Sequence, residues 1–227
     1  MLERGREGVN RNIPRLISVQ VGLPRVLDSG PDDSSGSSWE SGIFKERVAG
    51  PVWLGRLNLA GDGQADMRNH GGPDRAVLAY SADHYPLWRE ELDRRDLAHG
   101  VFGENLTIAG LTEDTVCIGD SFALGDAVLQ VSQPRQPCWK LERRLGQPGL
   151  VEMVLATGRG GWYCRVLREG YVEAGTSMVR LERPFPEWTI TRAHDAMRRR
   201  GEDPESAARL ALCTALSAGW REVLQGI

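Results

Sequence analysis

The stretch that decides the fold runs from residue 102 to residue 141 and reads FGENLTIAGLTEDTVCIGDSFALGDAVLQVSQPRQPCWKL. Its segments 106–108, 121–124 and 127–132 have the short apolar or alternating pattern that is typical of β-strands. The last two segments are separated by Gly125-Asp126, a pair that favours a tight turn between antiparallel strands. The stretch therefore predicts a β-rich body that contains a hairpin.

Strand-like and helical patterns continue on both sides of this stretch. Strands are expected at 16–21, 43–48, 52–59, 76–80, 162–167 and 178–181, and helices at 82–95, 137–145, 150–156, 191–200, 204–216 and 220–224. A loop rich in Ser, Gly and Asp occupies 28–42. We expect a loose N-terminal tail over 1–14, a mainly β body over 15–183 and a C-terminal three-helix appendage over 184–227, with Asp203 capping the helix that Pro204 opens.

The composition excludes several classes of protein. The chain has 28 basic and 31 acidic residues and a formal net charge of -3, which argues against bulk attraction to nucleic acid. The first 15 residues are polar and charged, without the apolar core of a signal peptide, and no segment approaches the roughly 20 apolar residues of a membrane span. We therefore expect a soluble, cytoplasmic protein with no membrane association.

The four cysteines have no metal-finger spacing, so we expect free thiols in a reducing compartment. Cys117, Cys164 and Cys213 lie in apolar strand-like or helical segments and are interpreted as small core residues. Cys138 lies between Pro137 and Trp139 at an expected helix start, with Arg135 and Lys140 close in sequence. The helix dipole and the cations should lower the pKa of this thiol, which suits a nucleophile or a soft-metal ligand. Local chemistry alone does not separate this hypothesis from an inert cysteine at a helix start.

Further clusters carry candidate binding residues. Residues 61–75, GDGQADMRNHGGPDR, could present backbone N–H groups and cations to an anion, or form an ordinary surface loop. The turn 102–106, FGENL, is a weak signal taken singly, and Lys45 is either a phosphate contact or a solvated strand residue. The chain lacks the Walker, G-x-G-x-x-G, H-E-x-x-H, Cys-x-x-Cys and serine-elbow motifs, so nucleotide-fold, zinc-hydrolase and serine-hydrolase functions are poorly supported.

Taken together, the run from 61 to 88, GDGQADMRNHGGPDRAVLAYSADHYPLW, and the run from 102 to 141 resemble the MOSC family, named after the C-terminal domain of molybdenum cofactor sulfurases. The resemblance covers 15–183, and the tail is similar to the three-helix appendage of the stand-alone bacterial branch that reduces N-hydroxylated bases such as 6-hydroxylaminopurine. It implies a mainly β, barrel-like fold. It also implies a molybdopterin cofactor whose molybdenum is bound by one protein cysteine, and this cysteine corresponds to Cys138. The implied reaction does not use pyridoxal phosphate.

The resemblance also assigns site residues. The cofactor-binding set is Cys138 together with Lys45, His70, Asp74, Arg75, Asn105 and Arg135. Cys138, His70 and Asn105 form the implied catalytic set, with His70 as a proton relay because imidazole titrates near neutral pH. The loop 28–42 departs from the family pattern and puts the role of Ser41 in doubt. The chain shows no flavin, haem or iron–sulfur motif, so we expect a separate reductase protein to deliver the electrons to a small N-hydroxylated substrate.

Two other functions remain open at this point. Cys138 could instead hold a persulfide or hand on the cofactor in a sulfur or cofactor carrier, because a low thiol pKa serves that role equally well. Arg198-Arg199-Arg200 could mark a nucleic-acid-binding tail, but such a run is usually a solvated helix end, and we expect no nucleic-acid binding. The tail is better explained by packing of Trp188, Trp220 and Leu224 on the body or on a second subunit, which leaves a homodimer open.

Overall fold

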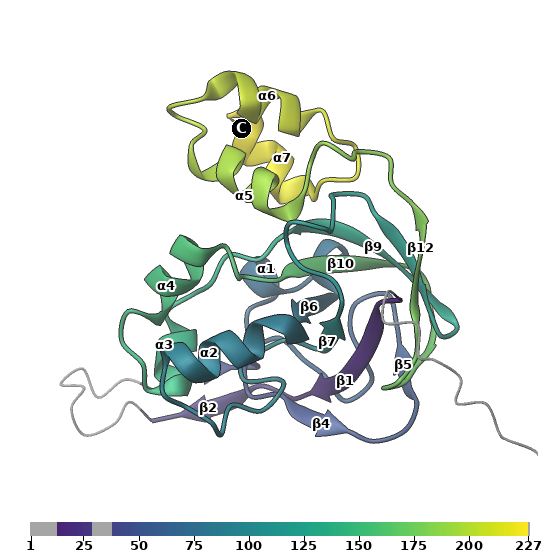
Figure 1. The fold of residues 1–227 in the computed structure, drawn as a ribbon, viewed down its shortest axis with the longest axis vertical. Coiled ribbons are helices and arrows are strands. Elements are labelled where there is room, and N and C mark those ends of the chain that lie inside the picture. The colour runs from purple at the N-terminus through teal and green to yellow at the C-terminus, as the bar shows by residue number, and fades with distance from the viewer. Residues whose placement is uncertain (1–12, 29–37, 227) are drawn as a thin grey trace, which may run out of the picture.

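The computed structural model describes residues 13–28 and 38–226, and Figure 1 shows a β-rich body with a group of helices at one end. An eight-stranded sheet runs in the order β12 (Met178–Glu182), β8 (Ser121–Leu124), β9 (Ala127–Pro134), β10 (Trp162–Arg168), β6 (Val77–Ser81), β7 (Leu106–Ala109), β1 (Arg15–Val21) and β4 (Glu46–Val48). Neighbouring strands are antiparallel except β6 and β7, which are parallel. Two strand pairs complete the body, namely β11 (Gly170–Val172) with β5 (Val52–Leu54) and β2 (Arg25–Leu27) with β3 (Trp39–Ser41).

The helices are short and lie mainly at the ends of the sheet (Figure 1). They are α1 (Met67–His70), the 3-10 turns η1 (Pro73–Arg75) and η2 (Ala82–His84), α2 (Tyr85–Glu91), α3 (Lys140–Leu145), α4 (Leu150–Thr157), α5 (Ile190–Arg198), α6 (Pro204–Ala211) and α7 (Ala218–Gln225). The predicted cap is confirmed, because the Asp203 carboxylate accepts a 3.0 Å hydrogen bond from the Ser206 amide. Among the described residues, no helix is both long enough and apolar enough to cross a membrane.

The expectation of a mainly β fold is confirmed, but the described strands form no closed barrel. The two flanks of the sheet nevertheless approach each other at the start of β1. Arg15 forms an antiparallel bridge with Ser177, and the Met178 amide donates a 2.7 Å hydrogen bond to the Pro14 carbonyl. The sheet is therefore strongly curled, and its concave side encloses the main hydrophobic core.

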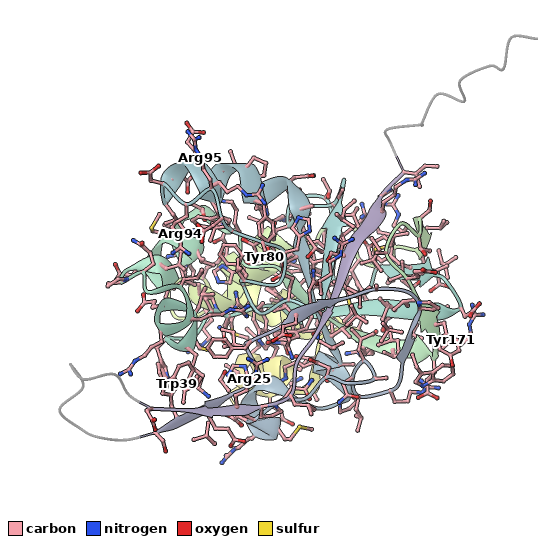
Figure 2. All side chains as sticks on the ribbon, turned by 90° about the horizontal axis from the view of Figure 1, so that it is seen from below. Arg25, Trp39, Tyr80, Arg94, Arg95 and Tyr171 are labelled. Carbon is pink, nitrogen blue, oxygen red and sulfur yellow. The ribbon has the colours of Figure 1, made fainter. Side chains whose placement is uncertain are left out.

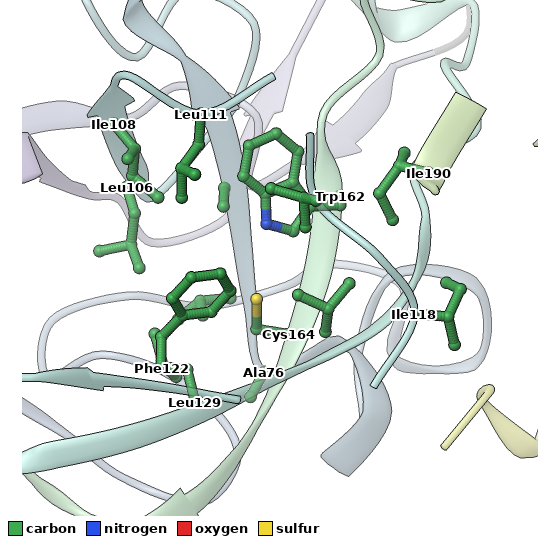
Figure 3. Packing of buried hydrophobic residues seen from close by; sticks show 14 of the residues in the cluster. Ala76, Leu106, Ile108, Leu111, Ile118, Phe122, Leu129, Trp162, Cys164 and Ile190 are labelled. Atoms are coloured by element: carbon green, nitrogen blue, oxygen red, sulfur yellow. The ribbon is translucent and has the colours of Figure 1, made fainter. Parts of the chain in front are cut away.

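That core fills the interior with large apolar side chains (Figure 3). Trp162 and Cys164 are two residues apart in β10, so their side chains point to the same face of the sheet. Both lie in the core near Phe122 (Figure 3). The same cluster continues into the tail through Ile190 and Trp220, so the helices after residue 183 share the core of the sheet. Burial of this kind supplies most of the stability of a β-rich body.

The interpretation of three cysteines as core residues is confirmed. Cys117, Cys164 and Cys213 are all buried, at 2% exposure or less. Burial disfavours the thiolate and raises the pKa of Cys164 and of Cys213 to about 12. None of these three thiols is therefore available as a thiolate near neutral pH.

A second hydrophobic cluster, rich in aromatic side chains, lies between the sheet and α2. The rings of Tyr80 and Phe102 stack at 4.7 Å between centroids, and the Trp88 indole donates a 2.6 Å hydrogen bond to the Tyr80 hydroxyl. Figure 2 shows Tyr80 in the interior, whereas Arg94 and Arg95 lie at the periphery. This rigid packing fixes the backbone around Phe102, which contacts the candidate site described below.

Several local predictions differ from the structure in their boundaries. The helix expected from Pro137 begins only at Lys140, because the Cys138 carbonyl accepts from the Leu141 amide in a turn that precedes it. Cys138 therefore lies outside the helix instead of in its first turn. The helix expected over 204–216 ends at Ala211, and β2, β3 and β11 were not predicted. Part of the loop expected over 28–42 lies outside the described residues, as does most of the tail expected over 1–14.

Candidate functional site

Two hollows meet at Cys138. The inner hollow is narrow, with a cavity volume of about 80 Å³, and lies between the loop 41–45, the segment 63–75 and the loop 135–140. The outer hollow is wider, with a cavity volume of about 840 Å³, and lies between the body and helices α5 and α7. The residues that line both hollows are His70, Arg75, Gln136, Cys138 and Tyr163. A molecule in the inner hollow and a second molecule in the outer hollow would therefore meet at these side chains.

Cys138 is the cysteine that the fold leaves accessible. It follows β9 and precedes α3, and it is half-buried, in contrast to the three core cysteines. Pro134 and Pro137 restrict the backbone of this connection, so its path across the mouth of the inner hollow is stiff. An accessible sulfur on a stiff loop is suited to ligand binding, as the sequence predicts.

Strand register decides which body residues face this sulfur. In β10, Tyr163 pairs with Gln133 of β9 and with Leu78 of β6, so these three residues lie side by side across the sheet. Leu78 lines the inner hollow, Gln133 lines the outer hollow, and Tyr163 lines both. The alternation along β10 places Trp162 and Cys164 on the opposite, core-facing side. Burial raises the pKa of Tyr163, so its hydroxyl stays protonated and can donate a hydrogen bond at neutral pH.

Arg135 offers a buried cation with an unused donor. It is only 5% exposed, and its Nη2 donates a 3.0 Å hydrogen bond to the Phe102 carbonyl. Its Nη1 is also buried and has no acceptor among the described residues. A buried unsatisfied guanidinium nitrogen costs free energy until an acceptor arrives. Because Arg135 lines the inner hollow, the structure holds a ready contact for an anionic or carbonyl-rich ligand there.

Lys45 and Asn105 are joined through a residue that the sequence did not single out. The Asp62 carboxylate is buried; it pairs with the Lys45 ammonium and accepts from the Asn105 amide at 2.9 Å and from the Gly22 backbone at 2.9 Å. The Asn105 carbonyl oxygen in turn accepts from the Leu78 backbone at 3.0 Å. Lys45 and Asn105 line the inner hollow, but their polar atoms are already engaged in this network. In the structure they support the wall of the hollow.

His70 and Arg75 lie on the segment between the two hollows. His70 ends α1, and Arg75 ends η1, where its Nη2 donates to the Arg68 carbonyl at 3.3 Å. Burial lowers the pKa of His70; the nearby cations of Lys140, Arg135 and Arg75 act in the same direction, while Asp66 opposes them. The imidazole is therefore neutral at pH 7 and can accept or hold a proton at a ring nitrogen.

Asp74 differs from the other predicted site residues, because it lines neither of these hollows within the described part of the chain. Its carboxylate pairs with Arg165 at 2.8 Å and accepts a 2.9 Å hydrogen bond from the Ala218 amide at the start of α7. Asp74 thus ties the C-terminal helices to the body. The remaining predicted residues, Lys45, His70, Arg75, Asn105, Arg135 and Cys138, all line the inner hollow, and their individual roles stay predictions.

Sequence reasoning did not assign Tyr163 or Gln136 to the site, and it named Lys140 only as a cation close to Cys138. The period-2 pattern of β10 could have shown that Tyr163 faces away from the core, but not what it faces. Asp62 was part of the quoted loop, although nothing local indicated that it pairs with Lys45. Within residues 13–28 and 38–226, no three His, Cys, Asp or Glu side chains gather so that they could hold a metal ion.

Comparisons with known proteins agree with this architecture. The chain matches the MOSC domain family over residues 66–179. It is 44% identical to YflK of Bacillus subtilis over 206 residues, which covers 91% of this chain and 90% of that protein. It is 40% identical over 186 residues to a Gibberella moniliformis protein named Reductase, covering 80% of this chain but 32% of that longer protein. The crystal structure of YiiM from Geobacillus stearothermophilus has a TM-score of 0.78 and 35% identity, covering 94% of this chain and 98% of that one.

Proposed function

Because this chain belongs to the MOSC domain family, we propose that it is a molybdenum-cofactor-dependent oxidoreductase that reduces N-hydroxylated compounds to amines. The family is associated with molybdenum-cofactor binding. The observation that carries the proposal is the position of Cys138, an accessible sulfur at the junction of two hollows, while the other cysteines are buried. Thiolate sulfur is a suitable ligand for a soft transition metal.

The side chains of the inner hollow offer contacts that suit the anionic pterin part of such a cofactor. A pterin phosphate is anionic, and Arg75, Lys140 and above all the unsatisfied Nη1 of Arg135 line the hollow. A single protein sulfur suits a metal that arrives with its pterin ligand, so we assign Cys138 as the metal ligand and Arg135 as an anion or ring contact.

The chemistry divides between the cofactor and the protein. Reduction of R–NHOH to R–NH2 consumes two electrons and two protons and releases water. When bound, the molybdenum cofactor supplies the two-electron redox chemistry that cleaves the N–O bond. The neutral His70 imidazole is the candidate to hold and pass on a proton, and the protonated Tyr163 hydroxyl is a candidate donor that orients the substrate. Lys45 and Asn105 keep the wall in place through Asp62.

We further propose that a separate reductase protein delivers the electrons. The Gibberella moniliformis relative named Reductase is much longer than this chain, which spans 32% of it. That arrangement supports the idea that proteins with this domain work together with additional polypeptide.

The test is to measure molybdenum and pterin in protein made by a host that synthesises the cofactor. Wild type, Cys138→Ala and the matched control Cys213→Ala would be compared by elemental analysis and by fluorescence of the oxidised pterin. We expect near-stoichiometric metal in wild type and Cys213→Ala and its loss in Cys138→Ala. We also expect the loaded protein to reduce 6-hydroxylaminopurine with reduced viologen as donor. Equal metal in all three proteins would refute Cys138 as ligand, and no metal in any of them would favour the sulfur-carrier function instead.

A further inference from the structure

The proposed function assigns no role to the outer hollow, yet it shares Cys138 with the inner hollow. Its far wall is built by the C-terminal helices, with Met197 and Arg200 at the end of α5 and Trp220 in α7. Two anchors hold this wall against the body: the Ala218 amide donates to Asp74 at 2.9 Å and the Ser217 amide donates to the Ser132 carbonyl at 2.9 Å. The wall is thus a fixed surface that faces the accessible sulfur.

The outer hollow has room for more than a small hydroxylamine. Its cavity volume of about 840 Å³ lies in the upper part of the roughly 300–1,000 Å³ of common small-molecule pockets. Val223, which is 49% exposed, and the 6% exposed edge of Trp220 supply an apolar surface for a planar heterocycle. Gln133 and Gln136 supply amide donors and acceptors. These features suit a substrate with a flat polar head and an extended second part.

The charges indicate what that second part carries. The outer lining holds three arginines, Arg68, Arg75 and Arg200, against one carboxylate, Glu222. The Arg200 Nη1 donates to the Met197 carbonyl at 3.0 Å, which directs the guanidinium along the end of α5. No carboxylate of the described residues pairs with Arg200, in contrast to the adjacent Arg199, which pairs with Glu202 at 3.2 Å. Guanidinium groups bind phosphate through short, charge-assisted hydrogen bonds.

We propose that the outer hollow is the substrate chamber and that it selects N-hydroxylated heterocycles bearing an anionic group, such as nucleoside monophosphates. The hydroxylamino end lies toward Cys138, the ring lies against the α7 wall, and the phosphate lies at Arg200. This inference rests on the proposed function for the reaction, but binding of the amine product does not require the metal. The C-terminal helices are then part of the active site, and Asp74 positions them.

The first experiment measures binding to cofactor-free protein by calorimetry, with adenine, adenosine and adenosine 5′-monophosphate as probes. We expect the monophosphate to bind most tightly and with the strongest salt dependence. Arg200→Glu should weaken its binding by about tenfold or more while leaving adenine unchanged, because a charge-assisted contact is lost. The matched control Arg199→Glu changes an exposed arginine of the same helix end and should have no effect.

A third variant locates the phosphate. Monophosphate binding that is lost in Arg135→Gln but insensitive to Arg200→Glu would place the phosphate in the inner hollow and overturn the inference. Equal affinity of wild type for adenosine and its monophosphate would overturn it as well. Each variant's thermal unfolding would be checked, and Arg200 is exposed, so folding should be retained.

The second experiment compares 6-hydroxylaminopurine with its ribonucleoside monophosphate as substrates of the loaded protein. We expect Arg200→Glu to raise KM for the monophosphate without changing kcat/KM for the base. If the base is reduced but the phosphate gives no advantage, the chamber assignment fails and the proposed reaction stands. If no substrate is reduced but the calorimetric pattern holds, the proposed reaction fails and the chamber stands.

Discussion

Substitution of Asp62 by Asn removes a charge from the best-buried ion pair next to the candidate site. The side chains of Lys45 and Asp62 are only 5% and 0% exposed, so the remaining ammonium is largely shielded from bulk water. The new amide can still accept from the Gly22 backbone or from Asn105, but it cannot neutralise the cation. Breaking a buried pair by removal of one partner costs about 3–5 kcal/mol in the free energy of unfolding. For a chain of this size the melting temperature should fall by roughly 6–20 °C.

The pH dependence of that loss separates charge from packing. Burial lowers the pKa of Lys45, and the attraction of Asp62 opposes this shift. Without the carboxylate the pKa falls further, so folded Lys45 binds fewer protons than unfolded Lys45 over a wider pH range. Stability then increases with pH, and the penalty of Asp62→Asn should be smaller near about pH 10 than near about pH 7.

Urea unfolding at both pH values measures this directly, with Glu46→Gln as the control. Glu46 pairs with Arg25, but the two side chains are 73% and 51% exposed, so we expect a change below about 1 kcal/mol. Equal losses in the two variants, or a loss in Asp62→Asn that stays constant with pH, would refute the claim that burial of Lys45 makes this pair costly to break.

Three further outcomes are expected. Ellman's reagent should react with one thiol, Cys138, in the native protein and with all four cysteines in denaturant. A fast reaction of the native Cys138→Ala variant would contradict the burial of the other three cysteines. Burial raises the pKa of Glu104, whose carboxylate accepts from Tyr85 and, at 3.0 Å, from Thr107. The folded protein therefore binds the proton more tightly than the unfolded chain, and stability should rise as pH falls through this raised pKa. Glu104→Gln should abolish this rise and should leave the free energy of unfolding near pH 7 unchanged or higher by up to ~1 kcal/mol. A large decrease in that free energy, measured by urea unfolding, would show that the charged carboxylate is required. Trp220→Ala should cost about 3–5 kcal/mol by the same method, because the ring belongs to the main core; a change below ~1 kcal/mol would mean that the appendage unfolds separately.

The residue pattern of short segments predicted much of the secondary structure and burial of this protein. Alternating apolar residues identified the central strands, because side chains of a strand point alternately to its two faces. The Gly125-Asp126 pair identified the turn between β8 and β9. Apolar neighbours marked three cysteines as buried, and the prolines and cations around Cys138 set it apart. Strand formation, turn formation and general burial depend mainly on residues that are close together in the sequence, so the sequence alone can predict them.

Relations between distant segments required the tertiary structure. Asp62 neutralises Lys45, Asp74 holds the first turn of α7 instead of lining the site, and one nitrogen of Arg135 is buried without an acceptor among the described residues. The outer hollow brings Cys138 together with Arg200 of the tail. A residue's sequence neighbours determine its secondary structure and general burial, but a charge meets its partner through strand register and chain crossing. The sequence by itself therefore singled out the accessible sulfur, and only the packing of remote segments decided what surrounds it.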